Sequence, residues 1–202
     1  NAATVLDCIE SFKHFGARIL VGDMASQDGT LDIIESSGQR FVHLNFNDDH
    51  SASKNKLLEA CQTEWVLLVE GHERLIRGFE SLSESMLLSE NSRVSVIQEQ
   101  VLTKPVRFVR RGTRLVNPVF DRFPSSNSFS SCLLGSTRQD RHDESLRIVK
   151  KWMSEKPLSV QPHYYNACVL LGKGDYGEFL KSANYYLFLE KSKPASWYMT
   201  KY

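Results

Sequence analysis

The sequence has few cysteines, no long apolar run and almost no net charge, and each absence excludes a class of protein. Its cysteines are Cys8, Cys61, Cys132 and Cys168. They show no C-x-x-C spacing, so neither a zinc site nor a disulfide framework is indicated. Apolar runs such as Trp65–Val69 are far shorter than the roughly 18 residues of a membrane span. Lys and Arg number 25 and Asp and Glu 24, and this balance argues against nucleic acid or an anionic membrane as partner.

The overall composition is that of an ordinary globular protein. Of the 202 residues 41% are hydrophobic and 24% are charged, which excludes a disordered chain or a fibre. The scattered cysteines are expected to be buried free thiols, and no signal peptide is visible, so a reducing compartment, the cytoplasm, is expected. The chain begins at Asn1 and ends at Tyr202 within structured-looking patterns, and we expect it to be part of a longer protein.

Helical and strand patterns alternate along the first third of the chain. Helices are predicted over 3–14, from Thr30, and from a cap at Ser51 or Ser53; strands are predicted over 18–21, 41–44 and 65–69. The last of these strands is apolar throughout, as is typical of parallel strands buried on both faces. This alternation predicts an α/β fold with crossover connections.

The pattern changes after Leu75. Strands are predicted over 94–97 and 106–109, where an antiparallel pairing is possible, followed by a Ser-rich connection over 123–137. A helical period begins at Asp143, with Pro157 and Pro162 expected to end that first helix. Two further helices around a turn at 172–175 form a hairpin of helical-repeat type. We therefore predict two domains, 1–137 and 138–202.

Polar side chains follow two of the predicted strands. Asp23 comes after the first strand, and Glu70, His72 and Glu73 come after the strand at 65–69. In open α/β sheets ligands bind beyond the carboxyl ends of the strands. There Asp23 can accept hydrogen bonds from a base or a ribose, and Glu70 with His72 can offer oxygen and nitrogen to a cation such as Mn²⁺. Ordinary turn chemistry in solvated loops explains the same residues, and spacing alone leaves both explanations open.

Four segments together resemble family 2 glycosyltransferases of the GT-A fold. Ile19–Thr30 resembles their V-V-D-x-x-S-x-D-G-T signature, and Asp49–Asn55 is similar to D-F-S-x-A-R-N. Glu64–Glu73 resembles E-W-x-L-x-x-D-A-D-E, in which the D-x-D carboxylates hold the metal and the nucleotide phosphates. Arg107–Arg111 is similar to the R-x-F-R strand that follows. Order and spacing agree with the family over residues 1–120.

The resemblance implies a GT-A-type, Rossmann-like nucleotide-sugar-binding domain followed by a helical segment. Asn1 is similar to the Asn of the family's N-E turn, which implies that the family's first strand is missing from this sequence. Residues 138–202 resemble the tetratricopeptide-like tail of family 2 enzymes that glycosylate bacteriocin peptides and of related bacterial protein glycosyltransferases. Such helical surfaces usually dock polypeptides, so a protein partner and a peptide, protein or glycan acceptor are expected.

The resemblance also implies a role for each residue of the site. The expected reaction transfers a sugar, with inversion, from a nucleotide-sugar donor, most simply a UDP-linked one. The residues expected to bind the donor are Asp23, Ser26, Asp28 and Lys54. Glu70 and His72 would hold Mn²⁺ or Mg²⁺ against the diphosphate. The candidates for the base that deprotonates the acceptor are Asp121 first and Glu73 second.

Several positions depart from the family's pattern. Glu70-Gly71-His72 stands where the family has D-x-D, although this acid-x-His form resembles the D-x-H motif of polypeptide N-acetylgalactosaminyltransferases. Lys54 replaces an Arg, and Phe120 replaces the His of the G-x-V-H-E segment. These changes support an alternative hypothesis, in which a catalytically degenerate domain serves as a binding or assembly scaffold. A third hypothesis, an unrelated α/β nucleotide-binding regulator, leaves the Arg107–Arg111 segment unexplained.

Overall fold

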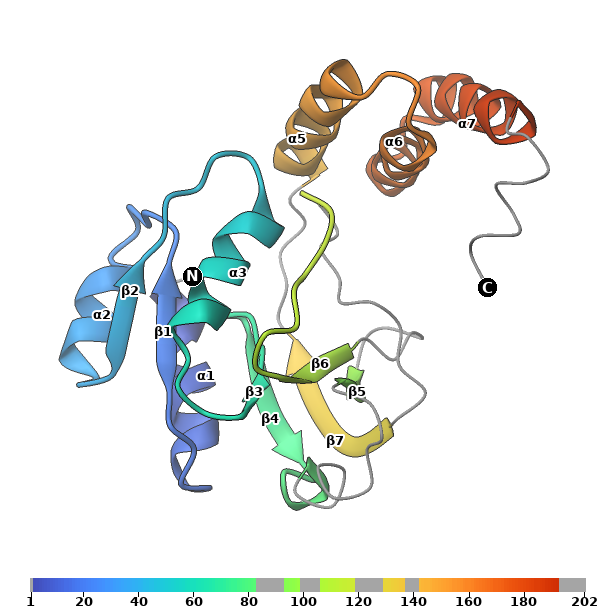
Figure 1. Cartoon of the computed structure of the whole chain (residues 1–202). Helices are drawn as coiled ribbons and strands as arrows, with labels where there is room; N and C mark the ends of the chain where they lie inside the picture. The colour runs from blue at the N-terminus through green and yellow to red at the C-terminus, as the bar shows by residue number, and fades with distance from the viewer. Residues whose placement is uncertain (1, 83–92, 99–105, 119–128, 137–141, 193–202) are drawn as a thin grey trace. The chain divides into compact units, whose positions relative to one another are not determined.

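The computed structural model describes residues 2–82, 93–98, 106–118, 129–136 and 142–192 (Figure 1). The chain divides into two compact units, one of residues 1–117 and 121–139 and the other of residues 118–120 and 140–202. Each unit is described by itself below. The predicted boundary at residue 137 stays a prediction.

The first two helices of the first unit lie where the sequence predicted them. α1 (Ala2–Lys13) buries Val5, Cys8, Ile9 and Phe12, the spacing of one helical face. α2 (Thr30–Ser36) begins after Gly29, whose φ of 78° is left-handed and suits glycine.

The third helix begins earlier than predicted. α3 (His50–Ala60) is capped by Asp49, whose side chain accepts a hydrogen bond from the Ala52 N–H at 2.8 Å. The predicted caps, Ser51 and Ser53, are therefore wrong, and both lie inside the helix. Aspartate is as good an N-cap residue as serine, and here the Asp49 carboxylate is the group that reaches the exposed N–H of the first turn.

The first two strands form a parallel pair. β1 (Leu20–Asp23) pairs in parallel with β2 (Arg40–His43), and α2 makes the crossover between them. The α/β alternation predicted for this part of the chain is confirmed. The third strand differs from its prediction, because β3 (Trp65–Leu67) ends before Leu68 and, within the described residues, its partner is the antiparallel β6 (Val106–Arg110).

The remaining strands complete a second, five-stranded sheet in the order β3-β6-β5-β7-β4. β5 (Arg93–Gln98) pairs with β6 in the antiparallel sense, which is the pairing that the sequence left possible for the strands predicted at 94–97 and 106–109. β4 (Glu73–Arg77) and β7 (Phe129–Ser136) were not predicted. β7 falls within the supposed connection at 123–137, so that prediction is wrong for its second half. Serine is common in turns, but here β7 forms ladders with both β4 and β5, and this pairing outweighs the local preference.

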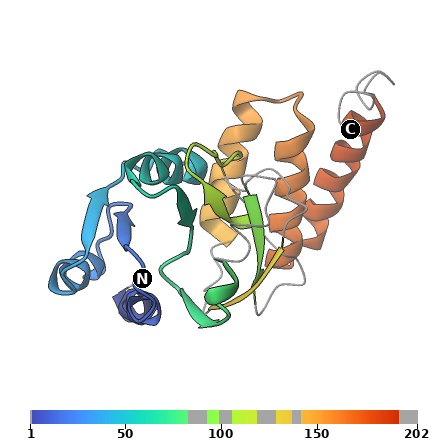
Figure 2. The same cartoon turned by 60° about the horizontal axis from the view of Figure 1, so that its bottom comes forward.

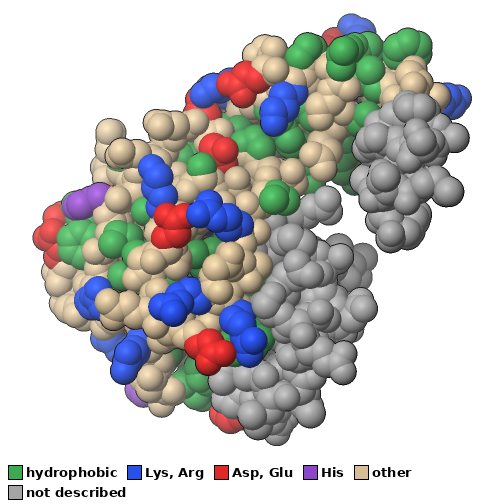
Figure 3. Space-filling model, viewed as in Figure 1, with side chains coloured by type: hydrophobic (Ala, Val, Ile, Leu, Met, Phe, Trp, Pro, Cys, Tyr) green, Lys and Arg blue, Asp and Glu red, His purple; other side chains and the backbone are tan. Residues whose placement is uncertain are grey.

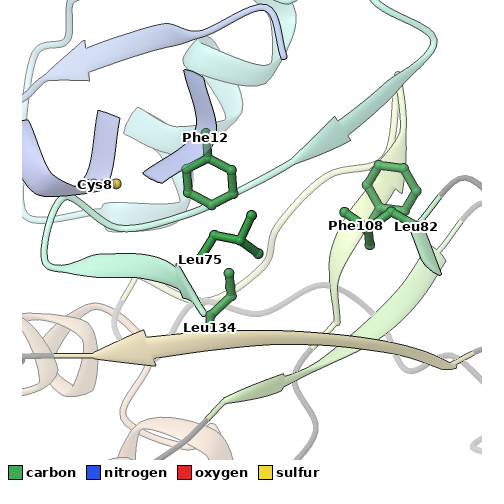
Figure 4. Close-up of a cluster of buried hydrophobic side chains, with 6 residues drawn as sticks. All are labelled: Cys8, Phe12, Leu75, Leu82, Phe108 and Leu134. Carbon is green, nitrogen blue, oxygen red and sulfur yellow. The ribbon is translucent and has the colours of Figure 1, made fainter. Parts of the chain in front are cut away.

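Helix α1 and the five-stranded sheet enclose the main core of this unit. Its buried members are Cys8, Phe12, Leu75, Leu82, Phe108 and Leu134. Figure 4 shows Leu75 between Phe12 and Leu134, so a helix residue and residues of two strands meet there. Leu134 is completely buried. This core holds the strand that precedes the Glu70–Glu73 turn and the strand that follows it, because Trp65 and Leu67 also pack against it.

A glycine in β1 permits the close approach of α3. A Cβ atom at Gly22 would lie 2.7 Å from Cδ1 of the buried Leu44 and 3.0 Å from Cδ2 of Leu57. We expect Gly22→Ala to lower the free energy of unfolding by about 1–3 kcal/mol, the usual cost of overpacking. Chemical denaturation measures this change. Gly177→Ala is the control, because its Cβ would meet only Asp175 Oδ1 at 3.9 Å; an equal loss in the control would contradict the explanation.

The described part of the second unit consists of three helices, which lie next to one another and are seen lengthwise in Figure 2. They are α5 (His142–Glu155), α6 (Val160–Lys173) and α7 (Tyr176–Lys191). The turn between the last two contains Gly174, left-handed at φ 78°, and Asp175, whose carboxylate accepts a hydrogen bond from the Glu178 N–H. The predicted helical hairpin is thus present.

One proline of this unit has a different place from the predicted one. Pro157 follows α5 as expected, whereas Pro162 lies in the first turn of α6 and does not end a helix. The first N–H groups of a helix have no partner within the helix, so a proline is tolerated there.

The surface of the helical unit carries many apolar side chains, as the green areas over α5–α7 in Figure 3 show. Exposed examples are Leu158, Tyr164, Leu171, Tyr176, Leu180, Leu187 and Phe188. Among the helices that the structure describes, none has the length and apolar character needed to cross a membrane.

Candidate functional site

The loop after β1 contains the first group of predicted donor-binding residues. Asp23, the last residue of β1, is buried, and both of its carboxylate oxygens accept the Ser26 N–H at 3.3 Å. His43, at the end of the neighbouring strand, has its Nδ1 3.9 Å from Asp23 Oδ2. Ala25, which lies between Asp23 and Ser26 in the loop, has a left-handed φ of 60°. The structure therefore brings Asp23 and Ser26 together in one tight turn at the carboxyl end of a parallel strand.

Asp28 continues this loop and connects two helix starts. Its Oδ1 accepts hydrogen bonds from the Thr30 N–H at 3.2 Å and the Thr30 hydroxyl at 2.5 Å, and its Oδ2 accepts the Ala2 N–H at 3.2 Å. The carboxylate thereby holds the beginning of α1 next to the beginning of α2. Ser26 and Asp28 are both exposed, whereas Asp23 is buried.

Most polar residues of the D-x-S-x-S-K-N segment (Asp49–Asn55), at the start of α3, form hydrogen bonds with neighbouring parts of the chain. Asp49 caps the helix, and the Ser53 hydroxyl donates to the Asn45 carbonyl at 3.0 Å. The Asn55 amide donates to the Leu115 carbonyl at 3.1 Å and accepts the Leu115 N–H at 2.8 Å. Asn55 thus pairs with a residue beyond β6 in the way that one strand residue pairs with another.

Lys54, the remaining residue of that segment, takes part in a buried ion network after β3. Its ammonium donates to Glu70 Oε1, and Arg107 of β6 approaches the same oxygen, with Nη1 at 3.8 Å. The other guanidinium nitrogen of Arg107, Nη2, donates to Glu73 Oε1 at 3.3 Å. The Lys54 side chain is 9% exposed and that of Glu73 is 0% exposed. Two cations are therefore shared between two carboxylates with little access to solvent.

The turn between these carboxylates is closed on itself and held against α1. The Glu70 N–H donates to Glu73 Oε2 at 2.7 Å, and the Glu73 N–H donates to the Glu70 carbonyl at 2.8 Å. The Thr4 hydroxyl donates to the Gly71 carbonyl at 2.8 Å, and the Cys8 thiol donates to the Glu70 carbonyl at 3.6 Å. Backbone oxygens of this turn are thus already used within the protein.

The neighbouring charges and burial set the ionisation of this network. Burial by itself would raise the pKa of Glu70, but Lys54 and Arg107 lower it to about 2. For Glu73 burial outweighs Arg107 and raises the pKa above its usual value. Burial, with help from the two carboxylates, raises the pKa of the Cys8 thiol to about 12. Cys8 is therefore an unreactive packing residue.

This donor set does not fit a divalent cation. Glu70, the only carboxylate of the Glu70-Gly71-His72 segment, already binds two cationic side chains. Within the residues that the structure describes, no three His, Cys, Asp or Glu side chains lie together as a metal site requires. A metal at Glu70 and His72 stays a prediction, and the contacts of Glu70 do not support it.

The structure brings some of the predicted site residues together, but not all of them. It brings Lys54, Glu70 and Glu73 into one network, and it places Asp23 with Ser26 in another turn. Arg107 was not predicted as a site residue, although the R-x-F-R resemblance contained it. The first candidate for the base, Asp121, lies outside the described residues. Glu73, the second, stays a prediction; its side chain is buried and pairs with Arg107.

Comparison with known proteins agrees with these motifs. Residues 1–86 match the family model described as glycosyl transferase family 2. A TPR repeat-containing protein of Synechococcus elongatus is 27% identical over 104 residues, which make up 51% of this chain and 26% of that protein. The match thus spans about a quarter of that relative's length, and its helical repeats agree with the helical second unit. Residues 1–86 are therefore similar to glycosyl transferase family 2, in agreement with the motifs found in the sequence.

Proposed function

We propose that the chain is the donor-binding part of a glycosyltransferase that uses a nucleotide sugar, most simply a UDP-linked one. The observation that carries this proposal is the turn formed by Asp23 and Ser26 at the carboxyl end of β1, inside the segment that matches the family. Ligands of open α/β sheets bind at such strand ends. The exposed Ser26 and Asp28 supply further polar groups beside the buried carboxylate.

In this proposal each residue has a distinct task. Asp23 fixes the loop and accepts a hydrogen bond from the uracil or the ribose, while Ser26 and Asp28 line the same loop. Lys54 faces the phosphates as a point charge. The acceptor is deprotonated on the face of the sugar opposite the leaving group, which gives inversion, and Asp121 is our candidate for that base. The buried Glu73 positions Arg107 instead.

We further propose a polypeptide acceptor that docks on the helical unit. The exposed aromatic and aliphatic side chains of α6 and α7 support this idea, as does the repeat-containing relative. Surfaces of helical repeats bind extended polypeptides through such side chains. The free Cys8, Cys61 and Cys168 are consistent with a reducing compartment, and we place the reaction in the cytoplasm.

Nucleotide binding provides the direct test. We expect UDP at 100 times its dissociation constant to stabilise the protein by about 2.7 kcal/mol, measured as a thermal shift. Asp23→Ala is expected to abolish the shift. The control is Asp32→Ala, an exposed carboxylate on α2, which should keep it. No shift with UDP, GDP or their sugars in the longest chain that folds would contradict a donor site.

The second candidate function is a scaffold that keeps the fold without the reaction. The observation that favours it is the internal pairing of Lys54, Glu70, Glu73 and Arg107, which leaves these charges satisfied without a ligand. The two functions differ in a measurable way. If the chain is a scaffold, UDP causes no thermal shift but the helical unit binds a polypeptide. If it is an enzyme, UDP causes a thermal shift and the helical unit also binds a polypeptide.

A further inference from the structure

The Glu70 carboxylate is the group on which a divalent cation at this turn would depend. Its Oε1 accepts a hydrogen bond from Lys54 and faces Arg107 Nη1 at 3.8 Å. The Glu70 side chain is 30% exposed, and a divalent cation that bound its carboxylate would lie close to both of these positive groups. A metal that used both oxygens of this carboxylate would therefore have to displace Lys54.

Lys54 has little freedom to leave. Its side chain is 9% exposed, and it projects from a helix whose start is fixed by the Asp49 cap and by the hydrogen bonds of Asn55 to Leu115. If a metal displaced it, a buried ammonium would lie beside a doubly charged ion. Both the lost pairing and the new repulsion oppose this exchange.

Arg107 adds a second positive charge beside Glu70, although its contact is longer than that of Lys54. Its guanidinium bridges Glu70 and Glu73, and its own side chain is 17% exposed. It comes from β6, which pairs with β3 along Trp65–Leu67, so the sheet fixes it opposite the turn. Two backbone oxygens of the turn are also engaged, because the carbonyls of Glu70 and Gly71 accept hydrogen bonds from Cys8 and Thr4.

We propose that the Glu70-Gly71-His72 turn binds no divalent cation, and that Lys54 and Arg107 supply in its place the positive charge beside which a nucleoside diphosphate binds. The part about the nucleotide rests on the proposed function, whereas the part about the metal does not. Lysine and arginine are both regular phosphate partners, so a diphosphate is a ligand that two such cations suit.

The test of the metal part is a titration of the protein with Mn²⁺, followed by the electron paramagnetic resonance signal of the free ion. We expect the unaltered protein to bind no Mn²⁺ at Glu70, and Lys54→Met to gain at least about tenfold in Mn²⁺ affinity, because Glu70 is released from one of its partners. Lys56→Met removes an exposed lysine of the same helix and should gain nothing. Circular dichroism checks that the variants are folded.

Either of two results would overturn the metal part. One is Mn²⁺ binding by the unaltered protein that Glu70→Gln abolishes, and this titration decides the matter even if Lys54→Met does not fold. The other is a folded Lys54→Met variant that shows no gain, because Lys54 would then not be what excludes the ion.

The nucleotide part is tested by the thermal shift with UDP in EDTA and in Mn²⁺. Equal shifts in the two media support a metal-independent site, and a shift that requires Mn²⁺ overturns it. If UDP causes no shift in either medium, the proposed function and the nucleotide part fail together, while the Mn²⁺ titration still decides the metal part.

Discussion

Glu70→Gln is expected to lower the free energy of unfolding by about 2–3 kcal/mol at neutral pH, and this difference should disappear as the pH falls toward 2. Lys54 and Arg107 lower the pKa of Glu70 from 4.5 to about 2, and each pKa unit corresponds to about 1.4 kcal/mol. The folded-state pKa is depressed, so the stabilisation is present above pH 4.5 and is lost as the pH falls through the folded-state value. The Glu70 side chain is partly exposed, so solvent screens its ion pairs and the expected loss is smaller than the full pKa difference would give.

Denaturant unfolding of both proteins over a series of pH values measures this difference. The control is Glu64→Gln, because Glu64 pairs with Arg110 at the surface, where both side chains are more than half exposed. Exposed pairs contribute at most about 1 kcal/mol, so the control should change little at any pH. A difference between Glu70→Gln and the unaltered protein that is constant with pH would show that Glu70 acts through packing alone.

Leu134→Ala is expected to lower the free energy of unfolding of the first unit by about 2–5 kcal/mol, the usual range for a leucine removed from a core. Leu134 is 0% exposed and belongs to β7, where its register partners are Leu75 of β4 and Gln98 of β5. Both neighbouring strands are held by their ladders, so they cannot easily close the space that the side chain leaves.

Urea denaturation followed by tryptophan fluorescence measures this change, since Trp65 packs against the same core. Leu6→Ala makes the same chemical change at a position that is 44% exposed, and it should lower the free energy of unfolding by less than about 1 kcal/mol. Similar losses for the two variants would mean that the core is not centred on Leu134.

Local patterns predicted the elements that depend on local chemistry. The apolar spacing of α1 and the strand–helix–strand order of β1, α2 and β2 are visible in the sequence because each element carries its own period. Strands β4 and β7 were missed because their stability comes from each other and from β5. A Ser-rich segment becomes a strand when two neighbours supply its hydrogen bonds, and no local window contains that information.

The candidate site shows the same division. The motifs identified Asp23, Lys54 and Glu70, but they did not show that Lys54 and Arg107 share the Glu70 carboxylate. Lys54 comes from a helix, Glu70 from a loop and Arg107 from a strand, and these elements lie far apart in the sequence. Their pairing depends on the antiparallel contact of β3 with β6. The apolar run at 65–69 had instead suggested a strand with parallel neighbours.

The hydrogen bonds of Asn55 and the ion pairs of Arg107 have a consequence for truncation. The segment that matches the family ends at residue 86, yet its α3 is pinned by Leu115 and its β3 is paired with β6. A fragment cut at the end of the match would leave Glu73 buried without its guanidinium and expose one edge of β3. We therefore expect a piece that folds by itself to be longer than the matched segment and to include residues 106–117.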